Sequence, residues 1–276
     1  MKHKKPVLYI IIPIAVIAII LFVGKLNLSR QYKKEVKTLF SQSKNISDKK
    51  FSYQQLEGLP TPVQKYFKHV MHEGQPYISN LRMTHNGQFK TGKDKDWINI
   101  EGEEYFTADN PGFIWKGKTS LFTARDMYIS KKGRLVVSVL SLFNVVDAQG
   151  EHYDQGELIR WLTESILFPT NFLPGENLQW EAIDSLSSKI IFNYNGQLLF
   201  LIVKFNDTGE ITEMETKRYM DENNLETWIC KADKYKEMNG IIIPTEFEVL
   251  WRLAKGDLSY AKFNLKEVAY NIPENF

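Results

Sequence analysis

Apolar residues divide the chain into two unlike parts. Val7 to Val23 form 17 consecutive residues without a charge, mostly Ile, Val, Leu and Ala. That length is at the short end for a helix that crosses a bilayer. From Ser79 onward, apolar and polar residues instead alternate in short runs separated by turn-forming residues, which is typical of half-buried strands. The pattern predicts one membrane helix followed by a β-rich body.

The flanks of the apolar run favour a retained anchor over residues 7–24, preceded by a basic tail over residues 1–6. The alternative is a signal peptide, but no A-x-A-like cleavage site follows the run, and no Cys is present there for lipid attachment. Helical spacing continues beyond the run, which predicts a juxtamembrane helix to about Phe40 and then a polar linker within residues 25–50. The residues that carry this spacing are Leu28, Tyr32, Val36 and Leu39.

Charge leaves two orientations to consider. Five Lys or Arg follow the run closely and three Lys precede it, a count that leans toward a cytoplasmic body. Against this, a short basic tail before an apolar core resembles the start of a secretory signal and is a poor candidate for translocation. We therefore expect a single-pass membrane protein whose body, residues 51–276, lies outside the cytoplasm.

Turn spacing defines the fold class expected for the body. It predicts about a dozen strands, with no room for the helical crossovers that a parallel sheet requires, so the sheet is antiparallel. Open twisted sheets of more than about ten strands curl. We predict a mainly β fold, a large curled antiparallel sheet forming a half-barrel or open barrel. Two amphipathic helices, near 62–71 and 155–167, are available to cover its concave face.

The charge distribution argues against nucleic acid as a partner. Residues 1–50 carry 11 basic and 2 acidic side chains, whereas residues 51–276 carry 24 basic and 31 acidic ones. The basic block thus flanks the apolar run, and an acidic body does not suit a phosphate backbone. The single Cys, Cys230, lies in an alternating segment and is expected to be a buried structural thiol.

The stretch from Asp147 to Trp180 concentrates the candidate site residues. On a helix, Glu157, Arg160 and Glu164 are three and four residues apart and share one face. One interpretation is an exposed ladder of ion pairs with little effect on stability. The other places Arg160 at a cavity mouth, held by both carboxylates and available to an anionic ligand headgroup.

Four tryptophans and several acids complete the candidate set. The tryptophans are core residues or the lining of a large apolar pocket; they are Trp115, Trp161, Trp180 and Trp251. The acids Asp147, Glu151, Asp154 and Glu157 do not have the spacing of a calcium loop. His69 and His72 are three residues apart but lack an obvious third ligand. The sequence therefore predicts no metal and no cofactor.

Six pieces of sequence, in order, resemble an uncharacterised bacterial family that carries a domain of unknown function. They are LPTPVQKYF, PGFIWKGK, VVDAQG, GELIRWLTESILFPTNFLPG, WEAID and IPTEFEVLW, and the resemblance covers most of residues 55–270. The architecture looks like the outer-membrane lipoprotein carrier fold. That resemblance implies a cavity for a hydrophobic ligand and supplies no catalytic residues.

Two classes of function remain open at this point. The first is a membrane-anchored module that binds a lipid or other hydrophobic molecule in the concave face of its sheet. The second is an envelope enzyme, hydrolase-like, using carboxylates of residues 147–164. No Gly-x-Ser-x-Gly motif is present, and His152 beside Glu151 is the best available pairing of a histidine with a carboxylate. The binding function is therefore the leading hypothesis.

Overall fold

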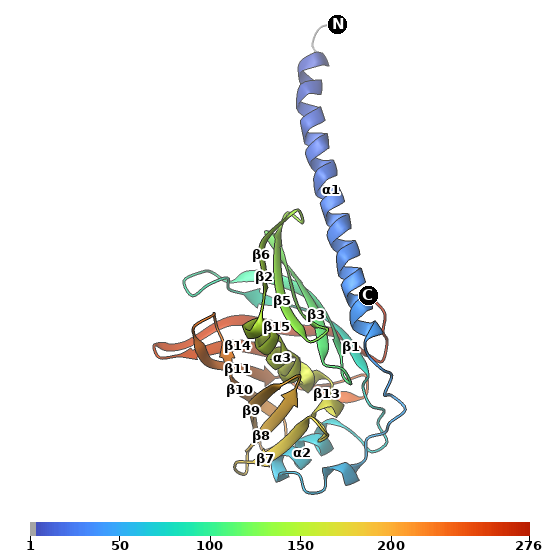
Figure 1. Ribbon diagram of the computed structural model, residues 1–276, viewed down its shortest axis with the longest axis vertical. Helices are drawn as coiled ribbons and strands as arrows, with labels where there is room; N and C mark the ends of the chain where they lie inside the picture. The colour runs from blue at the N-terminus through green and yellow to red at the C-terminus, as the bar shows by residue number, and fades with distance from the viewer. Residues whose placement is uncertain (1–3) are drawn as a thin grey trace.

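The N-terminal helix is long enough to include both the predicted span and the juxtamembrane segment. The computed structural model describes the backbone of residues 4–276 and the side chains of residues 11–276, so the side chains of the basic tail lie outside the described residues. Helix α1 (Lys4–Ser41) is continuous. Its described part is apolar enough to cross a membrane, with a mean hydropathy of 2.4 over the most apolar window. α1 rises clear of the body in Figure 1.

The body is built on one 13-stranded antiparallel sheet, which confirms the predicted mainly β fold. Its first six strands are β1 (Asn80–Phe89), β2 (Ile98–Thr107), β3 (Gly112–Lys118), β4 (Phe122–Ile129), β5 (Lys132–Val139) and β6 (Phe143–Gln149). The other seven are β7 (Leu178–Ala182), β8 (Ser187–Tyr194), β9 (Gln197–Phe205), β10 (Ile211–Tyr219), β11 (Leu225–Asp233), β14 (Glu246–Leu253) and β15 (Gly256–Tyr270). A short hairpin, β12 (Lys236–Met238) and β13 (Ile241–Ile243), lies outside it.

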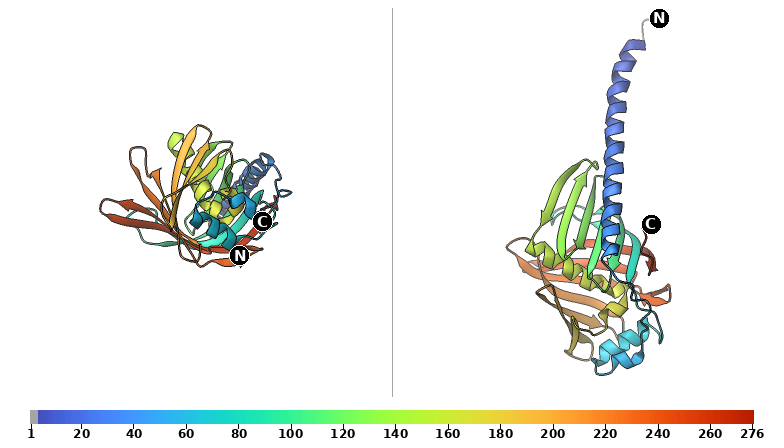
Figure 2. Two further views of the ribbon diagram at one scale, coloured as in Figure 1. Left: turned by 90° about the horizontal axis from the view of Figure 1, so that it is seen from below. Right: turned by 45° about the vertical axis from the view of Figure 1, so that its right-hand side comes forward.

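The strand order explains why a helix lies across the opening of the curled sheet. The sheet runs β6-β5-β4-β3-β2-β1-β15-β14-β11-β10-β9-β8-β7, so β6 and β7 are its two edges. Along the chain, these two edge strands are separated only by helix α3 (Glu151–Glu164) and two short 3₁₀ turns, Ser165–Leu167 and Pro169–Phe172. The connection between them therefore has to span the gap of the half-barrel. Figures 1 and 2 show α3 lying within the curve of the sheet.

Both predicted helices form, with different roles. Helix α2 (Thr61–Val70) buries Val63, Tyr66 and Phe67 and closes the end of the curl near β13. Helix α3 begins at Glu151, four residues before the predicted start at 155. Gly150, at φ 132°, ends the preceding strand, and Glu151 and Asp154 then fill the first helical turn, where acidic side chains are favourable.

Strands β2, β3 and β4 are buried on both faces, unlike most of the sheet. Successive side chains point to opposite faces of a strand. Glu104, Trp115 and Asp126 point into the curl, and their neighbours point outward. The outward residues Tyr105, Ile114 and Met127 form a second core with Tyr32, Val36 and Leu39 of α1. The juxtamembrane half of α1 is thus packed on the outside of the sheet.

A buried ion pair reinforces this packing of α1. Arg125 of β4 points outward, is only 1% exposed, and donates to both carboxylate oxygens of Glu35. Removing the carboxylate partner of a buried guanidinium strongly destabilises a fold, because the buried positive charge is then uncompensated. The ion pair therefore makes residues 25–41 part of the folded body.

This packing predicts different outcomes for two truncations. A chain that begins at Lys25 keeps the second core and should fold stably. A chain that begins at Phe51 exposes that core and leaves Arg125 unpaired, so its free energy of unfolding should fall by at least about 3 kcal/mol. Chemical denaturation monitored by circular dichroism measures both. Equal midpoints for the two chains would contradict the structural role of α1.

Candidate functional site

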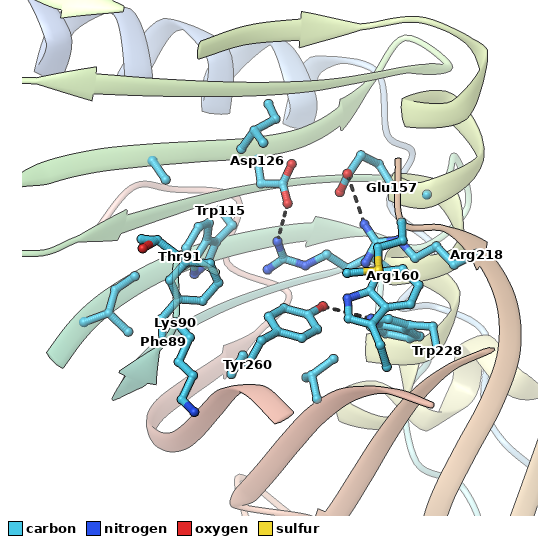
Figure 3. Close-up of a pocket in the computed structure, with 18 of the residues that line it drawn as sticks. Phe89, Lys90, Thr91, Trp115, Asp126, Glu157, Arg160, Arg218, Trp228 and Tyr260 are labelled. Atoms are coloured by element: carbon cyan, nitrogen blue, oxygen red, sulfur yellow. Dashed lines mark hydrogen bonds and ion pairs between the residues drawn. The ribbon is translucent and has the colours of Figure 1, made fainter. Parts of the chain in front are cut away.

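A cavity of about 890 Å³ lies between the inner face of the sheet and α3. Its walls are mostly apolar and come from both halves of the sheet, including Phe122 and Val137 on one side and Trp251 and Phe263 on the other. Its volume is within the range of small-molecule binding sites. Figure 3 shows Asp126 of β4, Glu157 and Arg160 of α3, and Arg218 of β10 gathered on one wall.

Arg160 is the centre of the polar wall. Each of its three guanidinium nitrogens donates to a different carboxylate: Nε to Glu164 Oε1 at 2.9 Å, Nη1 to Asp126 Oδ2 at 2.8 Å, and Nη2 to Glu104 Oε1 at 2.8 Å. The guanidinium carbon also lies 5.1 Å from the centre of the Trp115 ring. The side chain is thus fixed to α3 itself and to two strands of the N-terminal half of the sheet.

Glu157 pairs with a residue that the sequence prediction did not include. Its Oε1 accepts from Arg218 Nη2 of β10 at 3.3 Å, and Arg218 lies 5.2 Å over the ring of Trp228. Glu157 is only 3% exposed. Two expectations from sequence are therefore wrong. Glu157 is not a direct partner of Arg160, and the face of α3 that carries them is not a solvated ladder, because the curled sheet covers it.

Carboxyl groups outnumber cations in this cluster. Glu104, Asp126, Glu157 and Glu164 surround only two guanidinium groups, those of Arg160 and Arg218. Burial raises the pKa of Glu104 and of Glu157 well above the usual range, because an apolar site disfavours the charged form. The polar wall therefore disfavours any further negative charge.

This excess of acids changes the expected ligand. Arg160 is already committed to three carboxylates, so an anionic headgroup at Arg160, one of the two sequence interpretations, does not fit this geometry. Glu104 lies within hydrogen-bond reach of Glu164, and Glu157 within reach of Asp126, so neighbouring carboxyl groups satisfy one another inside the wall.

The four candidate tryptophans divide evenly between the cavity and the core. Trp115 and Trp251 line the cavity. Trp161 of α3 is fully buried and donates from Nε1 to the carbonyl of Thr107 at 2.8 Å. Trp180 packs on Phe172 and donates to its carbonyl. Trp161 and Trp180 are corrected to core residues, because α3 presents Trp161 to the sheet and β7 lies at the far edge.

The remaining acids of the 147–164 stretch are dispersed. Asp147 lies on edge strand β6 and forms a bidentate, half-exposed pair with Arg134, so its placement in the ligand site is corrected. Asp154 Oδ1 accepts from the backbone N–H of Gly133 at 2.7 Å and ties α3 to β5. Within residues 11–276 the side chains form no cluster of three or more His, Cys, Asp or Glu that could hold a metal.

Three histidines and the cysteine lie in surroundings that are typical of structural residues. His152 stacks on Tyr219 at the cavity wall, with ring centres 3.9 Å apart. His69 lies 3.6 Å from Glu210, and His72 follows the end of α2. Cys230 is buried, as the sequence predicts, and burial raises its pKa above the usual value of a thiol.

Sequence analysis missed the residues that the sheet contributes to the site. Glu104, Asp126, Arg218, Trp228 and Tyr260 all face the cavity, and Trp228 Nε1 donates to the hydroxyl of Tyr260 at 2.8 Å. The available signal was an acid at an inward position of an otherwise apolar strand face. That signal becomes visible only when the register of each strand is known.

His85 of β1 is a further buried group at the cavity. Its Nε2 accepts from Trp115 Nε1 at 2.8 Å, so this nitrogen carries no proton in the neutral ring. Burial, and secondly the nearby charge of Arg160, lowers the pKa of His85 to about 4. Protonation at Nε2 would also displace the hydrogen bond from Trp115.

The comparisons with known proteins place the chain in a family without a known activity. It belongs to the family of unknown function DUF6544, whose model matches residues 49–263. This confirms the family resemblance seen in the sequence. No curated protein sequence matches the chain.

Two solved structures resemble the chain in general shape. One is a LolA superfamily protein from Nitrosomonas europaea, with a TM-score of 0.42 and 11% identity, covering 77% of this chain and 93% of that one. The other is a domain assigned as an outer membrane lipoprotein-sorting protein, from Vibrio parahaemolyticus, with a TM-score of 0.29 and 8% identity, covering 70% and 86%. At this level of similarity, function has to be inferred from the residues of this chain.

Substituting Arg160 should reduce stability far more than an exposed ladder would allow. Arg160→Ala leaves Glu104, Asp126 and Glu164 without their shared cation, and we expect a loss of about 3–5 kcal/mol in the free energy of unfolding. Arg134→Ala is the matched control, because it removes a bidentate pair at the surface and should cost no more than about 1 kcal/mol. Denaturant titration measures both. Similar losses for the two variants would show that the buried cluster contributes no more to stability than the surface pair does.

His85 should make the protein less stable in mild acid. Its pKa is lower in the folded than in the unfolded state, so unfolding takes up a proton between about pH 6.5 and pH 4, and stability falls as the pH falls through that window. The raised pKa values of Glu104 and Glu157 act in the opposite direction, so the comparison needs a reference. We expect the wild type to lose about 3 kcal/mol more than His85→Gln over that window. If the stabilities of the two proteins fell in parallel over this pH range, His85 would not be the cause of the loss.

Proposed function

We propose that this protein is a membrane-anchored binding module that holds a lipid or other hydrophobic molecule in its curved sheet. The observation that carries the proposal is the cavity of about 890 Å³, whose lining is mostly apolar and comes from every strand of the sheet except β7, β8 and β9. An apolar cavity with a few convergent polar groups is the usual form of a small-molecule site. Helix α1 supplies the single-pass anchor, and the body lies outside the cytoplasm.

The polar wall orients the ligand in this proposal. An apolar chain fills the space between Phe122 and Trp251, and its polar end lies against the wall that carries Glu104, Glu157 and Glu164. A carboxylate or phosphate would face an excess of acid groups and a guanidinium, Arg160, that already pairs with three carboxylates, whereas an uncharged or cationic end would not be repelled. The ligand is therefore a neutral or cationic amphiphile.

The enzyme alternative has less support. It relied on the carboxylates of residues 147–164 acting together. In the structure, Asp147 and Asp154 are paired outside the cavity, and only Glu157 and Glu164 reach it. A nucleophile with an oriented base is the minimum for covalent hydrolysis. The Glu157–Arg218 and Arg160–Glu164 pairs hold charges in place but present no such combination.

Filling the cavity should abolish binding of an apolar probe. Ala124 and Ala261 are small residues of the lining, and the double substitution Ala124→Phe, Ala261→Phe places two rings in the empty space. The fluorescence of N-phenyl-1-naphthylamine, which increases in apolar surroundings, should rise with the wild type and stay at the buffer level with this variant. Lys217→Phe adds a ring at an exposed position of β10 and is the control. Equal fluorescence for all three proteins would refute the proposed cavity function.

The anchor is tested on the intact protein in its own membrane. Full-length chain should sediment with membranes, resist extraction by carbonate at high pH, and retain its original N-terminus, because no cleavage site follows Val23. Recovery of a soluble chain that begins near residue 25 would identify residues 1–24 as a signal peptide instead.

A further inference from the structure

Two hairpin tips beside α1 carry large apolar side chains in exposed positions. Leu121 lies between β3 and β4 and is 67% exposed. Leu140, between β5 and β6, is 59% exposed, and Phe143 and Val145 of β6 are 64% and 60% exposed. We call this group of four residues the apolar rim. A contiguous apolar patch on an otherwise acidic body indicates an interaction surface.

The second tip places a bulky apolar residue in a left-handed backbone conformation. Leu140 and Ser141 both have positive φ, at 54° and 60°, and Leu142 N–H bonds to the carbonyl of Val139. A turn with two left-handed residues is normally formed by Asn-Gly or Asp-Gly. A bulky Leu in that conformation is strained, and such strain is found where function requires the side chain. Its exposure in water would add a second cost with no gain inside the fold.

The rim lies at the level where α1 leaves the predicted span. The tips face Ala18, Leu21, Phe22 and Lys25 across a narrow groove, and Gly24 permits the approach, because a Cβ there would collide with Leu142. Figure 1 and the right view of Figure 2 both show the tips beside α1. A span over residues 7–24 is about 27 Å long, close to the thickness of the hydrocarbon layer. Its last turns, and the tips beside them, are therefore at the membrane interface.

The orientation of α1 on the body is fixed, so the rim cannot turn away from the membrane. The second core around Tyr32 and Val36 and the pair between Glu35 and Arg125 attach α1 to the outer face of β2–β4. Lys25 and Lys118 border the same groove. Basic side chains at this depth favour anionic lipid headgroups.

The rim is continuous with the cavity. Phe122, Val139, Val145 and Val146 line the cavity, and Val145 also belongs to the rim. Edge strand β6 is exposed along nearly its whole length. An apolar edge of this kind needs a cover. A bilayer would cover the rim and would at the same time bring lipid to the cavity mouth.

From these observations we infer that the apolar rim inserts into the bilayer interface beside α1 and sets the cavity mouth against the membrane. In this arrangement the apolar rim is covered by the outer lipid layer of the membrane that α1 crosses. This inference rests on the anchor of the proposed function and names the membrane itself as the source of the hydrophobic ligand.

Depth-dependent quenching tests this inference on the full-length chain. Leu121→Cys and the control Leu198→Cys are labelled with the fluorophore NBD, while Cys230 is buried and does not react. Leu198 is a comparably exposed leucine on β9, in the other half of the sheet. Both proteins are reconstituted into vesicles of phosphatidylcholine and phosphatidylglycerol, with or without bromine on the acyl chains. We expect the label at 121 to shift to the blue and be quenched by brominated lipid, and the label at 198 to show neither change.

Two results would overturn the inference. One is the absence of quenching at both positions. The other is a label at 121 that is shielded without quenching while the particles contain two chains, which would show that a second copy covers β6. The N-phenyl-1-naphthylamine measurement is independent. Probe binding without quenching rejects the rim and keeps the cavity function, whereas quenching without probe binding rejects the cavity function and keeps the rim.

Discussion

The structure depends on the two buried ion-pair groups by which α3 holds the halves of the sheet together. Arg160 joins α3 to β2 and β4 through Glu104 and Asp126. One turn earlier, Glu157 joins it to Arg218 of β10. An open antiparallel sheet has no hydrogen bonds between its edges, so its curvature is not fixed by the ladder alone. Charged contacts on a single helix fix the separation of the two halves and thus the width of the cavity.

The topology makes this arrangement possible. The chain builds the sheet outward from β1 to β6, crosses the opening as α3, and returns inward from β7 to β15, which pairs with β1. The segment at the middle of the sequence therefore covers the gap of the half-barrel. The polar residues that attach α3 therefore lie within an apolar space, where burial raises the pKa of Glu104 and of Glu157.

Helix α1 has two parts with different surroundings. The first part is apolar and, within residues 11–23, mostly exposed. The second part buries Tyr32, Val36 and Leu39 against the outer face of the sheet. Because the helix is continuous, the direction of its apolar part is fixed relative to the body. Strands β2–β4 consequently serve as the wall between the cavity and the docked helix.

The sequence by itself determined the apolar segment, the mainly β class, the curl of the sheet and the two helices, because each depends on local periodicity or on turn spacing. It also identified Arg160, Glu157, Glu164, Trp115 and Trp251, whose side chains do line the cavity. Their partners could not be found in this way. Asp126 and Arg218 meet α3 only after strand register, curvature and the crossover are set, and a one-residue shift in register would turn each of them outward. The burial of the Glu157–Arg160 face and the position of the hairpin tips beside α1 were likewise decided by the tertiary structure, because they join segments more than thirty residues apart in the chain.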